Sequence, residues 1–432
     1  MQSFYVKTFG CRASQADGAA LEAALAAEGL SQTSGAGAAD LVVLNTCTVT
    51  ATADDELRQT VRRIHRESPG ARILVTGCYA QRAPREIAAL PGVWLVAGNS
   101  HKSQIPDLIS TAAPYHGQVE VGDIFAQHDF LGGPVEDALG DRTRPNLKIQ
   151  DGCNNRCSFC IIPFVRGRSR SAPAEQVIAQ VRALAIRYKE VVLSGINLGR
   201  WGRDFDGRVR LVDLLRRLLD ETGIERLRLS SVEPMDFSDD LLGLMAESPR
   251  IAKHVHAPLQ SGSDTVLRRM HRKYRPRHYA DRIWKARELM PDCAVGADVM
   301  TGFPGETEEE FEQSRGFIES LPFTYLHVFT YSERPGTPAA ESLAQVPVAV
   351  RKQRTRVLRE LAAGKNLEFR RSMIGKTVSA VTLDEGALTE NYLKVKLASA
   401  REANRIVEVE VGGLTASGLY ESGVMNIMAD RA

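Results

Sequence analysis

The N-terminal third of the chain alternates short apolar runs with longer stretches of mixed polarity. The runs at residues 4–8, 41–45, 72–76 and 93–97 are rich in β-branched residues and are typical of buried parallel strands. Residues 16–28, 56–67 and 82–90 have the composition of the intervening helices. This alternation predicts a small open α/β domain, which we assign to residues 1–125.

A second series of strand and helix patterns begins at residue 145. Strands are expected at residues 146–150, 191–194, 226–230, 254–259, 294–300 and 325–330, with helices between them, such as 174–188 and 212–222. That number of units suits a partial (βα)6 barrel, with catalytic groups at the carboxyl ends of its strands. From about residue 98 to residue 144 the periodicity is lost and Gly and Pro accumulate, which predicts a linker, assigned to residues 126–144.

The C-terminal quarter changes character again. Residues 348–371 form one strongly basic helical pattern, which closes the central domain, residues 145–371, and is expected to add basic surface. Short alternating runs at 375–383, 392–397, 406–411 and 418–420 then predict a small antiparallel β-barrel at residues 372–432. In this last part acids outnumber bases, so RNA contact is expected from one face only, or the barrel is mainly structural.

Composition adds few constraints. The 432 residues are 43% apolar and 25% charged, with a net charge of +2, as in an ordinary soluble protein. The N-terminus has no basic segment followed by an apolar core, and no apolar run approaches the ~18 residues of a membrane span, so we expect a cytoplasmic protein without a membrane partner. In that compartment the seven cysteines favour metal ligation over disulfides.

Three of these cysteines lie close together after the first strand of the central domain. Cys153, Cys157 and Cys160 are separated by three and then two residues, a loop that can direct three thiolates at one metal centre. Structural zinc sites are normally closed by four protein ligands, whereas three ligands leave a position open for a small molecule. The spacing resembles the signature of the radical S-adenosylmethionine (SAM) superfamily, in which an open iron of a 4Fe-4S cluster binds SAM. A zinc knuckle completed by a distant ligand is the alternative.

The N-terminal domain contains a second set of three. Cys11, Cys47 and Cys78 each follow one of the expected strands, and the carboxyl ends of parallel strands share one crevice. Gly10 and Gly77 allow the backbone to approach closely there. Buried free thiols are the ordinary interpretation of any one of them, but all three at successive strand ends favour a second cluster. Cys293 has no such partner and is expected to be a buried thiol.

Both cysteine sets lie in recognisable surroundings. Residues 45–50 (NTCTVT), 75–81 (VTGCYAQ), 150–153 (QDGC) and 166–171 (RGRSRS) resemble the radical SAM methylthiotransferase family, and within it the tRNA enzymes that act on threonylcarbamoyladenosine (t6A). The resemblance covers nearly the whole length. It implies an N-terminal domain with an auxiliary 4Fe-4S cluster, a central radical SAM barrel, and a C-terminal RNA-binding module called TRAM.

The resemblance also suggests contacts beyond the cysteines. For SAM they are Phe159, Ser194, Gly195, Asn197, Gln260, Ser261, Asp298 and Gly302, mostly at strand ends, although polar or Gly/Pro turns of this kind can be purely structural. Basic residues beside the cysteine loop are candidates for tRNA phosphates: Arg166, Arg168, Arg170, Arg268, Arg269, Arg272 and Lys273. Runs of charge are often only solvated faces, and their position near the loop is what favours RNA.

The implied reaction replaces the hydrogen at C2 of adenine, a carbon that acid–base chemistry does not activate. SAM at the first cluster would yield a 5′-deoxyadenosyl radical, the second cluster would present the sulfur, and the nucleotide at position 37 would be turned out of its loop. The expected partners are tRNA and a flavodoxin- or ferredoxin-type electron donor, with the enzyme a monomer. The rival substrates are isopentenyladenosine-37 of tRNA and an aspartate of ribosomal protein S12, and the non-enzymatic rival is an RNA-binding protein with structural clusters.

Overall fold

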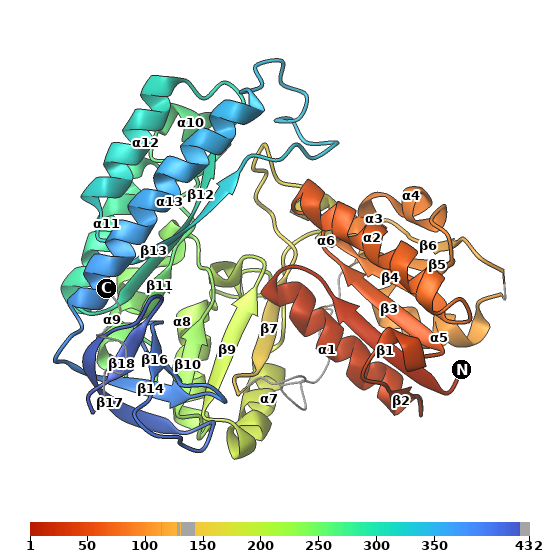
Figure 1. Ribbon diagram of the computed structural model, residues 1–432, viewed down its shortest axis with the longest axis horizontal. Coiled ribbons are helices and arrows are strands. Elements are labelled where there is room, and N and C mark those ends of the chain that lie inside the picture. The colour runs from red at the N-terminus through yellow and green to blue at the C-terminus, as the bar shows by residue number, and fades with distance from the viewer. Residues whose placement is uncertain (114, 128–129, 131–142, 424–432) are drawn as a thin grey trace, which may run out of the picture.

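Figure 1 shows the computed structural model, which describes residues 1–113, 115–127, 130 and 143–423. Three bodies follow one another along the chain: an open parallel sheet, an incomplete parallel barrel and a small closed barrel. The predicted fold class is therefore confirmed. Residues 131–142, which include the glycine- and proline-rich segment 131–134 on which the linker prediction partly rests, lie outside the described residues. None of the described helices combines the length and apolar character needed to cross a membrane.

The N-terminal sheet contains six parallel strands in the order β2-β1-β3-β4-β5-β6. Central strands β3 and β5 are buried on both faces, which explains their continuous apolar runs. Separate apolar cores lie on the two faces of the sheet. The strands are β1 Ser3–Thr8, β2 Ser31–Gln32, β3 Leu41–Thr46, β4 Arg72–Gly77, β5 Val93–Gly98 and β6 Gln118–Glu120, and the helices are α1 Arg12–Ala27, α2 Ala51–Glu67, α3 Cys78–Arg82, α4 Pro84–Ala88 and α5 Ile105–Thr111.

Two predictions for this region are wrong in detail. The single helix expected at residues 82–90 is two short helices, because Pro84 disfavours a helical conformation at Ala83 and starts a new helix after it. The loss of periodicity after residue 98 does not begin a linker. A 3₁₀ turn at Asn99–Gln104, helix α5 and edge strand β6 continue the domain, and β6 is too short to show an alternating pattern.

The central strands form an arc with two hydrogen-bonded parts, β10-β9-β7-β8 and β11-β12-β13. A parallel bridge between Leu227 and Ile251 joins β10 to the segment before β11, so the six parallel strands run in chain order β7, β9, β10, β11, β12, β13. This is the expected partial barrel. Its strands are β7 Asn146–Asp151, β8 Arg170–Ser171, β9 Glu190–Gly195, β10 Arg226–Leu229, β11 His254–His256, β12 Ala294–Thr301 and β13 Tyr325–Thr330.

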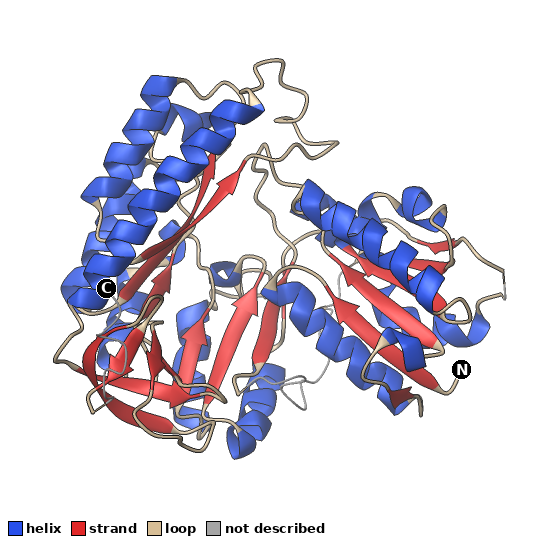
Figure 2. Ribbon diagram, in the orientation of Figure 1, coloured by secondary structure: helices blue, strands red, loops and turns tan. Residues whose placement is uncertain are grey.

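The two faces of this arc differ sharply in chemistry. Residues such as Leu147, Val191 and Val255 belong to one large apolar core. Helices lie around the outside of the strands of the arc (Figure 2). The alternate positions face the barrel interior and carry mainly polar groups: Asn146, Lys148, Gln150, Glu190, Ser194, Arg226, Arg228, His254, His256, Asp298, Tyr325 and His327. The helices are α6 Ile162–Arg166, α7 Ala174–Arg187, α8 Leu211–Glu221, α9 Asp239–Glu247, α10 Asp264–Arg269, α11 Pro276–Leu289, α12 Glu308–Ser320 and α13 Val348–Arg371.

Helix α13 has the predicted bounds and supplies part of the predicted basic surface, since Lys352, Arg356, Arg359 and Arg371 are exposed. Arg351, Arg354 and Arg370 are buried and bond to turns of the barrel and of the C-terminal part, so they fasten the helix in place. After it comes a closed barrel of β14 Thr377–Thr382, β15 Ala387–Thr389, β16 Lys394–Lys396, β17 Ile406–Leu414 and β18 Leu419–Glu421. Strand β15 was not predicted, since three residues show no alternation, and β16 pairs with β18 in parallel rather than antiparallel.

The three bodies meet around the interior of the partial barrel. Asp17 of α1 pairs with Lys148 of β7, and Asp54 of α2 pairs with Arg334 beyond β13, so the N-terminal domain contacts both ends of the arc. The C-terminal barrel is bound to β10, where Arg228 donates hydrogen bonds to the carbonyl oxygens of Thr389 and Glu390.

Candidate functional site

Two cysteine loops at neighbouring strand ends

The loop that carries Cys153, Cys157 and Cys160 begins where β7 ends. Gly152 has a φ of +67°, and a Cβ there would lie 1.9 Å from the carbonyl oxygen of Arg168, so only glycine fits. The Cys153 amide donates to the carbonyl of Gly167, and the Ser158 amide donates to that of Met270. The sequence thus folds this stretch into a fixed loop at the mouth of the barrel.

Hydrogen-bond donors surround two of the sulfurs. The Arg272 guanidinium donates to Cys157 Sγ at 3.2 Å, and the Asn155 amide donates to Cys153 Sγ at 3.4 Å. Asn197 Nδ2 lies 3.7 Å from the same sulfur of Cys153. Burial raises the pKa of Cys153, and it raises that of Cys160 to about 12. Three half-buried thiols with amide and guanidinium donors form a donor set suited to an iron–sulfur cluster.

The N-terminal cysteines also lie near one another. Cys11 follows β1, Cys47 follows β3 and Cys78 begins α3 at the end of β4. Gly10 has a φ of +91°, and a Cβ on it would lie 2.8 Å from Cys47 Sγ. Burial raises the pKa of Cys47 to about 12, with contributions from the nearby Cys78 and Cys11 thiols. The crevice predicted from the strand pattern therefore contains all three thiols.

Helix α6 lies between the two sets. Cys78 packs against Ile161 and Val165, in the segment that follows Cys160. Asn99 donates from one Nδ2 to Cys78 Sγ at 3.6 Å and to the Val165 carbonyl at 2.7 Å. The last residue of the loop and the auxiliary cysteines are thus separated by one short helix.

Positions of the other predicted residues

Five of the predicted SAM contacts lie near the mouth or interior of the barrel. Ser194 Oγ is buried and bonds to no other described group, Asn197 contacts the cysteine loop, and half-buried Asp298 faces the interior. Gly195, at the end of β9, packs closely on the side chain of Gln150. Phe159, half-buried in the loop, makes an edge contact with Phe303 at 6.4 Å.

The other three predicted SAM contacts occur in turns. Gln260 has a positive φ of 65°, an unusual conformation for a residue with a side chain. Ser261 Oγ is bonded to Ser314 Oγ of α12 at 2.9 Å, and its hydroxyl is occupied within the turn. Gly302 has a φ of +70° and lies directly against Arg351, so it has a clear packing role.

The basic residues divide into two groups. Arg168, Arg268, Arg269 and Lys273 are exposed, as an RNA contact requires. The prediction that Arg166, Arg170 and Arg272 face RNA is wrong, since all three are buried. Arg166 pairs with Asp17 and Asp151, Arg170 donates to the carbonyl of Arg166, and Arg272 pairs with Glu233 at 2.5 Å. The sequence shows that these positions are basic. It does not show which carboxylates of other elements pair with them once the chain has folded.

Sequence reasoning missed the polar interior of the barrel. His256 Nε2 lies 3.5 Å and His327 Nδ1 lies 3.2 Å from Asp298 Oδ1, a group whose ligand atoms are close enough to surround a single ion. Burial lowers the pKa of His256 to about 4, which keeps its ring neutral. Polar residues at every second position of β9, β10 and β11 were the available signal, because buried barrel strands are otherwise apolar.

Comparison with known proteins

Two family models match the chain. The Radical SAM superfamily matches residues 147–318, and the Uncharacterized protein family UPF0004 matches residues 3–98. The first range covers the partial barrel up to its last strand, β13, and the second covers the parallel sheet up to its edge strand, β6, together with the second cysteine set. The fold and the loop thus identify a radical SAM protein with an additional N-terminal α/β domain.

Curated relatives extend over almost the entire chain. The threonylcarbamoyladenosine tRNA methylthiotransferase MtaB of Aquifex aeolicus is 37% identical over 93% of this chain and 98% of its own length. The protein of the same name from Bacillus subtilis is 40% identical over 89% and 88%. The tRNA-2-methylthio-N(6)-dimethylallyladenosine synthase of Saccharopolyspora erythraea is 34% identical over 89% and 79%. The chain belongs to the tRNA methylthiotransferase family of radical SAM enzymes.

A solved structure agrees at the level of the fold. The radical S-adenosylmethionine methyltransferase TsrM from Kitasatospora setae, with cobalamin and a [4Fe-4S] cluster bound, matches with a TM-score of 0.56. The match covers 79% of this chain and 77% of that one at 16% identity. Membership of the radical SAM superfamily implies a 4Fe-4S cluster and SAM, and the loop with Cys153, Cys157 and Cys160 lies within the range that the superfamily matches.

Proposed function

We propose that this protein adds a methylthio group to C2 of t6A at position 37 of tRNA. The observation that carries the proposal is the pair of three-cysteine sets on either side of α6, each at carboxyl ends of parallel strands. Relatives that carry the t6A name are 33–40% identical over nearly the whole chain, which favours this substrate. A transfer of sulfur and a methyl group to an unactivated carbon needs both a radical source and a sulfur source.

A second 4Fe-4S cluster on Cys11, Cys47 and Cys78 is part of the proposal. Its support is the convergence of three thiols at one crevice, together with Gly10, whose lack of a side chain allows the Cys11 loop to approach Cys47. When bound, the clusters and SAM supply the radical and sulfur chemistry that no side chain of this protein can provide. The protein's own residues hold these groups, orient the base and exclude water.

The residues at the barrel mouth have separate tasks in this proposal. Asn197 lies beside Cys153, and Gly195 ends β9 against Gln150, so both are assigned to the side of the loop where SAM would bind. Ser194 Oγ, which is buried and unpaired, offers a hydroxyl to the same ligand. Gln260 and Asp298 contribute from the opposite strands. We assign Ser261 and Gly302 to holding the turns that position Gln260 and α13.

The RNA would approach the mouth of the barrel. Arg156 lies over the rings of Phe125 and Phe164 at 5.6 Å, and the ring of Phe164 is exposed next to the cysteine loop. An exposed ring with an arginine beside it is suited to stacking on a base that has left its loop. Exposed Arg168 and Lys273 lie on the same side and would contact phosphates.

Three further statements complete the proposal. A flavodoxin- or ferredoxin-type donor supplies one electron, because reductive cleavage of SAM consumes one. The protein acts as a monomer, since both cysteine sets and the barrel interior come from a single chain. The reaction takes place in the cytoplasm, on tRNA that already carries t6A.

The test is mass spectrometry of tRNA nucleosides from cells that lack the gene, complemented with different variants. Wild-type protein should restore 2-methylthio-t6A, whereas Cys157→Ala and Cys47→Ala should restore none. Cys293→Ala is the matched control, because Cys293 is buried on the far side of the barrel core and belongs to neither set. This variant should restore wild-type levels.

The same experiment separates the rival substrates. A tRNA profile without any change in 2-methylthio-t6A contradicts the proposal. Loss of 2-methylthio-isopentenyladenosine instead would favour the other tRNA substrate, and loss of a methylthio group on ribosomal protein S12 would favour the protein substrate. A binding protein with structural clusters would show none of these losses.

A further inference from the structure

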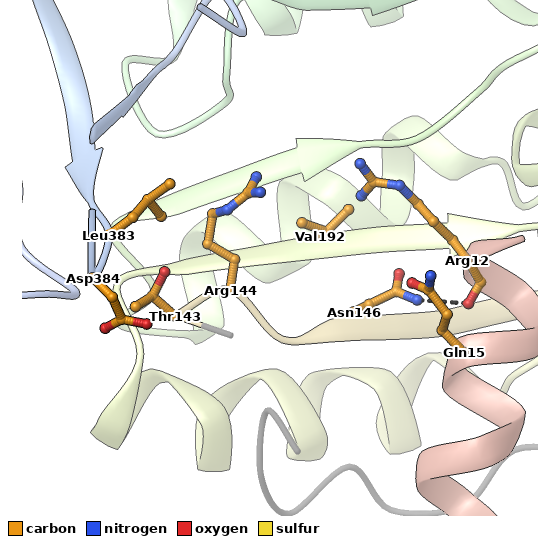
Figure 3. A pocket seen from close by; sticks show the side chains of 8 residues that line it. All are labelled: Arg12, Gln15, Thr143, Arg144, Asn146, Val192, Leu383 and Asp384. Carbon is orange, nitrogen blue, oxygen red and sulfur yellow. Dashed lines mark hydrogen bonds between the residues drawn. The ribbon is translucent and has the colours of Figure 1, made fainter. Parts of the chain in front are cut away.

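A pocket of about 360 Å³ opens at the end of the barrel interior opposite the cysteine loop. Helix α1, strands β7 and β9, and the loop after β14 contribute its walls, so all three bodies of the protein meet there. The guanidinium groups of Arg12 and Arg144 lie on the same side of the two strands, on either side of Val192 (Figure 3). The remaining lining residues are Gln15, Thr143, Asn146, Leu383 and Asp384.

Arg12 differs from the other arginines of this interior in its partners. Arg144, Arg226 and Arg228 all share the buried carboxylate of Glu190. Arg12 forms no ion pair with any described residue, and its guanidinium makes a long contact of 3.5 Å with the Tyr392 hydroxyl. Arg12 is therefore a half-buried cation in an arginine-rich interior, and an anion from outside the chain would complete its bonding.

Unpaired polar atoms continue from this pocket toward the barrel mouth. Asn146 Oδ1, Ser194 Oγ, Ser230 Oγ and His256 Nε2 are buried and have no hydrogen-bond partner among the residues that the structure describes. Buried polar atoms are normally bonded, and four of them on the inner face of neighbouring strands indicate a polar ligand that supplies the partners. The imidazole of His256 stays neutral, because burial lowers its pKa to about 4, and it can therefore donate or accept.

The position of the pocket fits one end of the proposed substrate. Strand β7 runs from Asn146 to Asp151 and places the pocket about 17 Å below the cysteine loop, at ~3.3 Å per residue. A SAM molecule at the loop followed by an adenine with an extended N6 substituent spans a length of that order. The substituent of t6A ends in a carboxylate and carries a hydroxyl and a urea group, whereas an isopentenyl group has no polar atom.

We propose that the guanidinium of Arg12 binds the carboxylate of the threonylcarbamoyl group, and that this contact selects t6A over unmodified and isopentenylated adenosine. The inference rests on the proposed function, since it names how the same site recognises its substrate. A site built to pair a polar group rejects an analogue that lacks it, because its own buried groups then stay unpaired. Asp384 does not oppose the contact, because its carboxylate lies at the far end of the pocket and points away from both guanidinium groups (Figure 3).

The test compares binding of two anticodon stem-loops that differ only at position 37, one with t6A and one with unmodified adenosine. Wild-type protein with its clusters should bind the t6A stem-loop about tenfold more tightly, the effect of one good charge-assisted contact. Arg12→Gln should bind both stem-loops equally. Arg168→Gln is the matched control, because this exposed arginine would contact phosphate and its loss should weaken both stem-loops by the same factor.

Two additional measurements keep the result interpretable. Arg12 is adjacent to Cys11, so iron content and the electron paramagnetic resonance spectrum of Arg12→Gln must match wild type. Asn146 Nδ2 donates to the backbone carbonyl of Arg12 at 2.7 Å, so the iron content of Asn146→Asp must match wild type as well. This variant should also reduce the preference for t6A, because its carboxylate competes for the Arg12 guanidinium.

The outcomes separate this inference from the proposed function. If wild type prefers t6A and both variants keep that preference, the role of Arg12 is wrong and the proposed function stands. If wild type does not distinguish the stem-loops and forms no 2-methylthio-t6A, the proposed function itself fails. Loss of the preference in Arg12→Gln and Asn146→Asp, but not in Arg168→Gln, supports the assignment.

Discussion

At the scale of single residues, the proposed auxiliary site depends on the missing side chain of Gly10. Its φ is +91°, and a Cβ would lie 2.4 Å from the Cβ of Cys47, so no other residue fits without moving the loop that carries Cys11. We expect Gly10→Ala to lose the auxiliary cluster and to bind about half of the wild-type iron, because the left-handed backbone and the contact both oppose an added methyl group. Chemical iron determination and electron paramagnetic resonance would measure this.

The same variant should leave the other cluster intact. SAM cleavage by the cluster on Cys153, Cys157 and Cys160 is expected to continue, while methylthio transfer stops. Gly29→Ala is the control, since Gly29 also has a positive φ but has no atom within 4 Å of an added Cβ. Full iron content in Gly10→Ala would contradict the assignment of Cys11 to the auxiliary site.

Arg272 illustrates a second effect at the scale of one residue, a fixed positive charge next to a sulfur of the cysteine loop. Its guanidinium lies 3.2 Å from Cys157 Sγ and is held by Glu233 at 2.5 Å. Because reduction adds negative charge to a cluster, a neighbouring cation stabilises the reduced form. Arg272→Met should therefore lower the midpoint potential by some tens of millivolts, as followed in a redox titration by electron paramagnetic resonance.

Arg272→Lys keeps the positive charge and serves as its control. It should shift the potential less than Arg272→Met does. Equal potentials for wild type and Arg272→Met would show that the guanidinium has only a structural role in the loop.

At the scale of elements, buried ion pairs of Asp17 connect helix α1 to the partial barrel. Asp17 pairs with Lys102, Lys148 and Arg166, which come from three other elements of two bodies. Burial alone would raise the pKa of Asp17, but these three cations hold it well below the ordinary value. Asp17→Asn would leave buried cations without their carboxylate and should destabilise the fold by roughly 3–5 kcal/mol.

The pH dependence of this contribution has a definite sign. Since the pKa of Asp17 is lower in the folded than in the unfolded protein, its stabilising effect is complete above about pH 4 and is lost as the pH falls below that value. Urea unfolding at pH 7 and pH 3.5 should show a smaller difference between wild type and Asp17→Asn at the lower pH. Asp107→Asn, an exposed position on α5, should change stability by less than about 0.5 kcal/mol at either pH.

Most elements could be predicted from the sequence, and the exceptions have physical causes. Helix α13 and the strands of the arc follow from composition and period, because local preference and burial agree there. Strands β6 and β15 were missed because three residues carry no periodic signal, and their pairing depends on neighbours distant in sequence. Composition predicted one helix at residues 82–90, but the chain forms two short helices there because Pro84 begins a new one.

The candidate site residues could be predicted where they lie close together in the sequence. Where their role depends on contacts between distant segments, the sequence predicted it only in part. Cys153, Cys157 and Cys160 are fixed by a short motif, and the strand pattern placed the other three cysteines at strand ends. The roles of Arg166, Arg170 and Arg272 depend on carboxylates and carbonyl groups that only the fold brings near them. Arg12 is a candidate because it has no carboxylate partner among the described residues. That property depends on the fold and could not be predicted from the sequence.

At the scale of the whole molecule, all three bodies contribute residues to the interior of the partial barrel. The N-terminal sheet supplies the auxiliary cysteines and Arg12, the arc supplies the cysteine loop and its polar inner face, and the C-terminal barrel adds Tyr392. Figure 1 shows the N-terminal sheet beside β7 and the small barrel near β10 and β11. A nucleotide that enters this interior must leave its own stack, so the remaining RNA has to be held at the outer surface.

That surface should make tRNA binding sensitive to salt. Lys273 is exposed beside Asn155 of the cysteine loop and forms no ion pair with a described residue, whereas exposed Arg268 is already paired with Asp264 at 2.9 Å. Each phosphate contact contributes about one unit to the slope of log affinity against log salt concentration. Lys273→Gln should therefore reduce the slope by about one, and Arg268→Gln should reduce it less because a carboxylate already neutralises that charge.

Lys285, a cation on the outside of the arc, provides the control for Lys273→Gln. Lys285 of α11 is paired with Glu288 at 3.2 Å, and its helix covers the outer face of the barrel strands, away from the mouth (Figure 1). Lys285→Gln should leave both the affinity and its salt slope unchanged. If Lys273→Gln behaves like Lys285→Gln, the RNA does not contact Lys273, and Arg168, the other exposed cation beside the cysteine loop, would have to carry the phosphate contacts at the mouth.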